Sequence, residues 1–60
     1  KAIEFYNKAL EIVINVFGDK HPNVARSYNN LGEAWRALGN AKKAIEFYNK
    51  ALEIVINVFG

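Results

Sequence analysis

The chain of 60 residues contains no cysteine, a single proline and a single histidine. Without cysteine it has neither a disulfide framework nor a thiolate metal site, the supports that small domains often use. A domain of this size buries only about 60% of the surface of its unfolded chain, so its stability must come from packing alone. Because thiol-free chains fit a reducing compartment, we expect a cytoplasmic protein.

A strong charge of one sign is also missing. Eight basic and six acidic residues give a net charge of +2, and the two signs are mixed along the chain. No basic block of the kind that binds nucleic acid or an anionic membrane is present. The longest apolar run, residues 54–56, is far shorter than a membrane span, and no signal-peptide layout is visible. We therefore expect neither nucleic acid nor membrane as a partner.

What the chain does have is a segment written twice. The residues KAIEFYNKALEIVINVFG occupy positions 1–18 and, without a single change, positions 43–60. The step from position 1 to position 43 is a period of 42 residues, which indicates a helical-repeat solenoid. Identity over the whole segment indicates recent duplication or deliberate copying. We expect one helical-repeat fragment, 1–60, in which 1–18 ends one repeat and 19–60 is a full repeat.

The repeated segment has the pattern of a helix that is buried on two sides. Its polar residues recur at steps of three or four and form one narrow stripe: Lys43, Glu46, Asn49, Lys50, Glu53 and Asn57. The apolar residues fall on two adjacent faces, Ala44, Tyr48, Ala51, Val55 and Val58 on one and Ile45, Leu52, Ile56 and Phe59 on the other. A helix with so wide an apolar surface is expected to pack between two neighbours.

A β-strand is the alternative for the end of this segment, EIVINVF, because Ile, Val and Phe favour sheets. The helical pattern continues into it from Ala44 without a turn signal, and Glu46 with Lys50 forms a favourable i,i+4 pair. We therefore predict a helix. The strand remains an aggregation hazard, since residues 54–59 carry no charge and no proline.

A second helix is predicted between the two copies. Pro22 suits a first helical turn, His21 or Asn23 can cap it, and Gly39-Asn40 is typical of a helix end. Gly32 lies inside this helix at a cost of about 1 kcal/mol, so we expect the backbone of the next helix to approach closely there. Its apolar residues recur at three and four: Val24, Ala25, Tyr28, Leu31, Ala34, Trp35 and Leu38.

The predicted structure is all-α, with helices over 1–17, 22–38 and 41–59. Turns as short as these make neighbouring helices antiparallel hairpins. The shared core is predicted to consist of Tyr28, Leu31, Ala34, Leu38, Ala44, Tyr48 and Ala51.

The motif Y-x-x-L-G-x-x-W at residues 28–35, followed by Ala44, Tyr48 and Ala51, resembles the tetratricopeptide repeat. The first copy repeats the last three as Ala2, Tyr6 and Ala9, so the resemblance covers the whole chain. It implies an α-solenoid of antiparallel hairpins in which each repeat is a helix A and a helix B, here in the order B-A-B. It also implies a set of repeat-packing residues: Tyr28, Leu31, Gly32, Trp35, Ala44, Tyr48 and Ala51.

Two features differ from the common pattern of this family. The period is 42 residues rather than 34, and Ile56 stands where a proline usually ends helix B. The long form, with HPNVA leading into helix A and YNNLG within it, looks like the repeats of kinesin light chain and of related bacterial proteins.

The resemblance implies a non-catalytic scaffold that binds a protein or peptide in a concave groove lined by helix A. Asn30, one place before Leu-Gly, matches an Asn that grips the peptide backbone in the family. The candidate groove residues are Arg26, Asn29, Asn30, Glu33, Arg36 and Ala37. The alternatives are a structural or engineered element that only stacks on itself, and RNA reading of the pentatricopeptide kind, for which the period and the base-reading side chains are missing.

No residue cluster indicates catalysis, a metal or a cofactor. His21 has only Asp19 nearby, which is too few ligands for zinc, and we expect it to be a cap or a solvated turn residue. Ser27 has no base to activate it, and Glu46 and Glu53 lie on a wet stripe rather than in a cleft. The segment GEAWRALGN is not a phosphate-binding loop.

The B-A-B order predicts self-association. Each helix B has two apolar faces, but the chain contains a single helix A to cover them. Apolar strips of this kind rarely stay exposed. We expect the chain to associate end to end through head-to-tail contacts that do not close, and identical copies make exchange of helices between chains inexpensive.

Overall fold

The computed structural model describes residues 2–59, and helices account for nearly all of them. They are α1 (Ala2–Phe17), α2 (Pro22–Ala37) and α3 (Ala41–Phe59). The predicted all-α fold is confirmed, and the segment that had a strand as its alternative is helical within the described range. Lys1, which was predicted to be helical, lies outside the described part of the chain. So do Gly60 and the side chain of Phe59.

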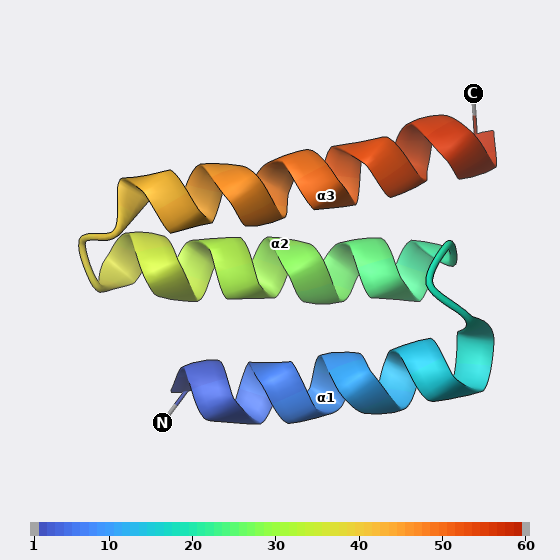
Figure 1. Ribbon diagram of the computed structural model, residues 1–60, viewed down its shortest axis with the longest axis horizontal. Helices are drawn as coiled ribbons and strands as arrows, with labels where there is room; N and C mark the ends of the chain where they lie inside the picture. The colour runs from blue at the N-terminus through green and yellow to red at the C-terminus, as the bar shows by residue number, and fades with distance from the viewer. Residues whose placement is uncertain (1, 60) are drawn as a thin grey trace.

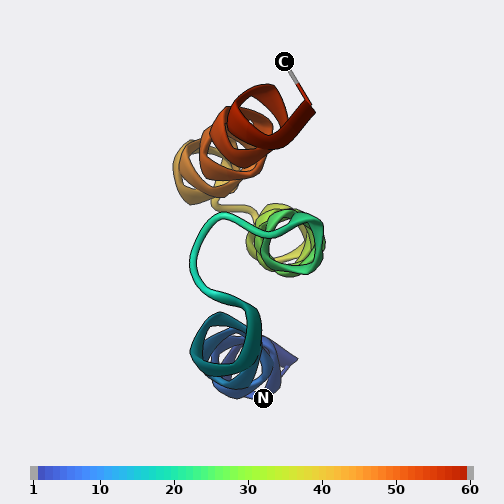
Figure 2. The same ribbon diagram turned by 90° about the vertical axis from the view of Figure 1, so that its right-hand side faces the viewer.

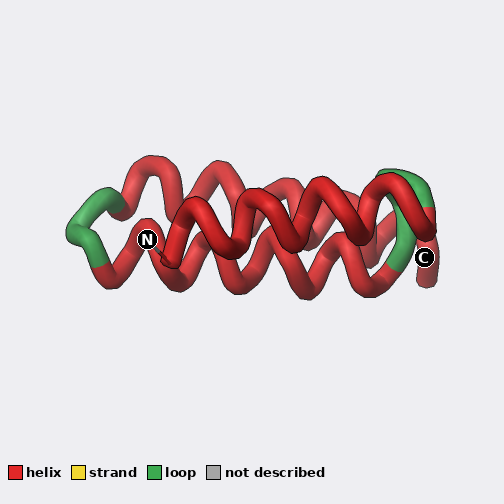
Figure 3. The backbone as a smooth tube through the Cα atoms, turned by 90° about the horizontal axis from the view of Figure 1, so that it is seen from below, coloured by secondary structure: helices red, strands yellow, loops and turns green. Residues whose placement is uncertain are grey.

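The three helices lie side by side as two consecutive antiparallel hairpins, with α2 in the middle (Figure 1). The two loops lie at opposite ends of the bundle (Figure 3). Over residues 2–59, α2 packs against both neighbours, whereas the backbones of α1 and α3 do not come close to each other. Seen along the helices, α2 is displaced sideways from the line between α1 and α3, so one side of it faces neither helix (Figure 2).

Glycine in a left-handed conformation ends each of the first two helices. Gly18, with φ of 86°, donates its N–H to the carbonyl of Ile14 at 2.8 Å. Gly39 has the same φ, and its N–H and that of Asn40 donate to the carbonyls of Arg36 and Trp35, both at 2.9 Å. This pair of bonds is a Schellman motif, which satisfies the last carbonyls of α2 and turns the chain back toward α3.

Side chains also cap the starts of α2 and α3. His21 is the N-cap of α2: its Nδ1 accepts a hydrogen bond from the backbone N–H of Asn23 at 3.1 Å, and Pro22 follows in the first turn. The His21 ring stacks on Phe17 with centroids 4.3 Å apart, which ties the end of α1 to the start of α2. The Asn40 side chain accepts from the N–H of Lys43 at 3.1 Å. Of the two capping residues considered for α2, His21 is the one that caps it.

The core lies where α2 meets its neighbours, and Val24 and Leu31 are completely buried there. Of the predicted core, Leu31, Ala44 and Ala51 are buried, whereas Tyr28, Ala34 and Tyr48 are half-buried. The prediction was wrong for Leu38, which is 69% exposed. Helix α2 ends at Ala37, one residue before the predicted end, so Leu38 is the C-cap and lies beyond the packed part of the helix.

The face of α3 that packs on α2 is rotated from the apolar face that the sequence pattern draws through Ala44, Ala51 and Val58. Val55 and Val58 share that face in the sequence pattern but are 40% and 39% exposed. The buried residue is Ile54, at 7% exposure, with Phe47 half-buried on the same side. The contact stripe on α3 therefore steps through 44, 47, 51 and 54, a spacing that keeps to one face of a helix.

Gly32 provides the space for an aromatic ring of α3. A Cβ placed on Gly32 would lie 2.7 Å from Cε1 and 2.8 Å from Cδ1 of Tyr48. A close approach at this glycine was expected, but it is made by the ring of Tyr48 rather than by the backbone of the next helix. Alanine, although it is the better helix former, would clash with this ring.

Candidate functional site

The candidate groove residues share one side of α2. Arg26, Asn29, Glu33, Arg36 and Ala37 are exposed, and Asn30 is half-buried. Steps of three and four residues place them on one face, the polar face opposite the buried stripe of Val24, Ala25, Leu31 and Gly32. Two guanidinium groups, one carboxylate and two amides on one helix face offer both donors and acceptors to a partner.

Contacts with α3 fix the orientation of α2 and therefore of this stripe. The ring of Tyr28 stacks on that of Phe47 at a centroid distance of 6.1 Å. The ammonium group of Lys50 lies 5.8 Å from the Tyr28 ring, and that of Lys43 lies 4.8 Å from the Trp35 ring. These aromatic and cation–π contacts run along the α2–α3 boundary and hold the polar stripe away from α3.

Two hollows border the polar stripe, and the sequence indicated neither. One lies between α2 and α3 and is lined by Asn29, Tyr48, Asn49, Ala51, Leu52 and Val55. The other lies between α1 and α2 and is lined by Ala2, Ile3, Ala34, Ala37 and Leu38. Because Asn29 and Ala37 each belong to both the stripe and a hollow, the stripe continues into apolar surface on either side.

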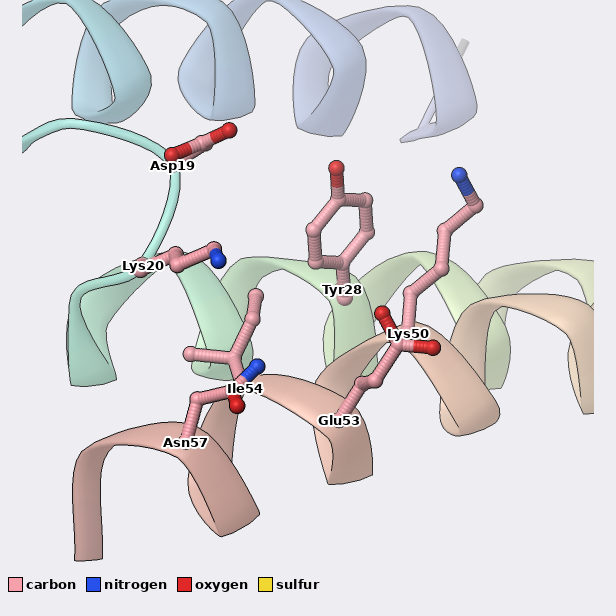
Figure 4. Close-up of a pocket in the computed structure, with 7 residues that line it drawn as sticks. All are labelled: Asp19, Lys20, Tyr28, Lys50, Glu53, Ile54 and Asn57. Carbon is pink, nitrogen blue, oxygen red and sulfur yellow. The ribbon is translucent and has the colours of Figure 1, made fainter.

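A third, more polar hollow lies at the end of the bundle near the first loop (Figure 4). It is lined by Asp19, Lys20, Tyr28, Lys50, Glu53, Ile54 and Asn57, and the Tyr28 hydroxyl points toward α1. Two lysines and two carboxylates share this hollow, so it has no excess charge that would select an anion or a cation. It is separate from the polar stripe on α2.

Two residues considered as possible metal-binding or catalytic groups make hydrogen bonds within α2 and its cap instead. His21 uses its Nδ1 as an acceptor in the helix cap, and the Ser27 hydroxyl donates to the carbonyl of Asn23 at 3.2 Å. Among residues 2–59, no three His, Asp or Glu side chains come together as metal ligands would. In the same range, no helix combines the length and the apolar character needed to cross a membrane.

The two identical helices present different faces to α2. We define face I as Ile3, Leu10, Val13 and Ile14 on α1, with the copies Ile45, Leu52, Val55 and Ile56 on α3. We define face II as Ala2, Phe5, Ile12 and Val16 on α1, with the copies Ala44, Phe47, Ile54 and Val58 on α3.

Helix α1 packs on α2 through face I, and α3 packs on α2 through face II. Leu10, Val13 and Ile14 of α1 lie against the buried cluster. On α3, Leu52 is the copy of Leu10 and Ile56 is the copy of Ile14, and they are 57% and 59% exposed. Face II shows the reverse: Ile54 is buried in α3, and its copy Ile12 is 63% exposed in α1. Helix α1 therefore exposes face II, which α3 buries, and α3 exposes face I, which α1 packs on α2.

Comparison with known proteins supports a single family. The model of the tetratricopeptide repeat family matches residues 1–57, nearly the whole chain. No curated protein and no solved structure matches the chain. The family match, the antiparallel helix pairs and the aromatic, Leu-Gly and Ala positions in their packing agree, and the chain belongs to the tetratricopeptide repeat family.

Proposed function

We propose that the chain is a non-catalytic scaffold whose α2 face binds an extended segment of a partner protein. The family generally mediates protein–protein interactions, which supports the general assignment. The observation that carries the specific proposal is the polar stripe on α2, which faces neither α1 nor α3 and continues into an apolar hollow on each side.

The chemistry of the stripe suits a peptide backbone with apolar side chains. The Asn30 amide offers a donor and an acceptor, as a peptide group requires, and half-burial restricts its motion. Arg26, Glu33 and Arg36 would contact charged or polar side chains of the ligand. The hollows beside Asn29 and Ala37 would receive its apolar side chains. A reducing compartment, the cytoplasm, remains our proposal for its location.

Asn30→Ala and Arg36→Ala are each expected to weaken peptide binding by about 1 to 3 kcal/mol, because each leaves a polar group of the bound peptide without a partner. The probe is a peptide selected from a random displayed library against the immobilised chain. Its affinity for each variant is measured by fluorescence anisotropy, and circular dichroism checks that helicity is unchanged.

The polar stripe of α3 supplies the matched controls. Glu46→Ala and Glu53→Ala replace exposed residues of α3 that line neither hollow beside the α2 stripe, and they are expected to leave the affinity unchanged. If these two variants, or Lys43→Ala, weaken binding while Asn30→Ala does not, the ligand lies on α3 and the groove assignment is wrong.

A second candidate function is end-to-end self-association. It is favoured by the exposure of face I on α3 and face II on α1, which places large apolar side chains on both ends of the structure. Phe5, Ile12 and Val16 are 68%, 63% and 67% exposed, and Ile45, Leu52 and Ile56 are 58%, 57% and 59% exposed. Exposed apolar patches of this kind mark association surfaces. Because the two ends differ, the contact is heterologous and forms open chains.

Self-association predicts a sedimentation coefficient and a melting temperature that rise with concentration over a range from about 1 μM to about 1 mM. Binding between copies stabilises the folded state by mass action, so both quantities change together. Analytical ultracentrifugation and thermal circular dichroism make the measurements. A compact monomer whose melting temperature is constant across this range rules the candidate out.

A further inference from the structure

We infer that α1 occupies, within its own chain, the surface of α2 to which α3 of a second copy docks. The inference rests on the proposed self-association and specifies the surfaces that make the contact. In this arrangement α1 of the accepting chain is displaced, and α3 of the second copy takes its place on α2.

The first step is the identity of the two helices. The surface of α2 that carries α1 contacts face I, which in α1 includes Leu10, Val13 and Ile14. Face I of α3 has the same side chains at the same helical positions, Leu52, Val55 and Ile56. An α3 helix placed on this surface would therefore make the contacts that α1 makes, and α2 has no side-chain contact by which to distinguish the two.

The second step is the attachment of α1. Within Ala2–Phe17 no residue is buried, whereas α2 and α3 both contribute residues to the buried core. Beyond its packing on α2, α1 is connected through residues 18–21 and the stacking of Phe17 on His21. Elements with few buried contacts open most readily, so α1 is the helix that can leave the bundle at least cost.

The third step is that α3 offers a larger surface than α1. Beside face I of α3 lies the hollow that is lined by Asn29 of α2 together with Tyr48, Leu52 and Val55. Placed there, α2 of the accepting chain contacts both α2 and α3 of the second copy. In its own chain, the same surface of α2 contacts α1 alone. The exchange therefore replaces the contacts with face I of α1 by equal contacts with face I of α3, and it adds contacts between the two α2 helices. Opposing it is the linker, which holds α1 at an effective concentration of order mM.

A chain that has accepted α3 in this way still exposes face I on its own α3. It can dock on the next copy, so the contact repeats head to tail without closing. A rigid contact that leaves α1 in place is the competing arrangement. It would instead put face I of α3 against face II of α1.

Three single substitutions are compared in the full chain by sedimentation equilibrium. Leu10→Asp and Ile12→Asp distinguish the two arrangements, and Leu52→Asp tests face I of α3, which both arrangements use. Leu10→Asp disrupts face I of α1 and leaves face I of α3 intact, so it opens the docking surface. The apparent dissociation constant between copies is expected to fall at least about tenfold, because a larger fraction of chains is competent to bind. Leu52→Asp, the same change in the identical sequence of α3, is expected to abolish association.

Ile12→Asp tests the competing contact at an exposed position of face II, where folding is not at risk. Exchange predicts that association is unchanged by Ile12→Asp, and rigid stacking predicts that it is lost. If Ile12→Asp abolishes association, the exchange is wrong while self-association stands. If the unmodified chain does not associate at all, both are wrong. Circular dichroism checks that the Leu10→Asp chain is still helical, and if it is not, the Ile12→Asp result decides alone.

Discussion

Ile54→Ala is expected to lower the free energy of unfolding by about 2 to 5 kcal/mol, whereas Ile12→Ala should change it by no more than about 0.5 kcal/mol. Both isoleucines stand at the same position of the same eighteen-residue sequence. Ile54 is 7% exposed and packs with Val24, Ala25 and Ala51, whereas Ile12 is 63% exposed. Truncating Ile54 leaves a cavity in the core, while truncating Ile12 removes a side chain that water already surrounds.

The measurement is urea unfolding followed by circular dichroism, at a concentration low enough to keep the chain monomeric. Because the local sequences are identical, helix propensity and the unfolded state are affected almost equally by the two variants, and their difference reports tertiary burial. Equal losses of stability would contradict the arrangement in which the two copies pack on α2 through different faces. A much larger loss for Ile12→Ala would place α1, rather than α3, at the centre of the core.

Leu31→Ala is expected to cost about 2 to 5 kcal/mol, and Leu38→Ala no more than about 0.5 kcal/mol. The two leucines are seven positions apart in the sequence and share a helix face in its pattern, yet Leu31 is completely buried and Leu38, the C-cap of α2, is 69% exposed. Since small domains are stable by only a few kcal/mol, Leu31→Ala is expected to leave much of the chain unfolded near room temperature.

The same urea titration checks this pair, with the melting temperature as a second readout. Leu38→Ala is the control, because it removes the same number of atoms at the C-cap of the same helix. A loss of more than about 1 kcal/mol for Leu38→Ala would mean that α2 continues past Ala37 and buries that side chain. The prediction that Leu38 belongs to the core would then be right.

The helices and their ends are predictable because the signals that set them are local. Residues three and four apart share a helix face, Pro22 suits only the first turn of α2, and Gly18 and Gly39 adopt a φ of 86° that other residues resist. The family pattern follows for the same reason, since its aromatic, Leu-Gly and alanine positions stand at fixed offsets along each helix. The polar stripe on α2 is likewise what remains once its apolar face is assigned.

The sequence by itself therefore determined the fold class, the three helices and the face of α2 that stays polar. Only the tertiary structure decided which apolar face of each repeated helix is covered, because two identical segments contain no local difference that could distinguish them. Their burial depends on which side of α2 each one reaches, and chain connectivity and packing decide that. Packing also selected Ile54 over Val55 and placed the Tyr48 ring against Gly32, because apolar residues adjacent in sequence can be ranked only by the neighbour that meets them.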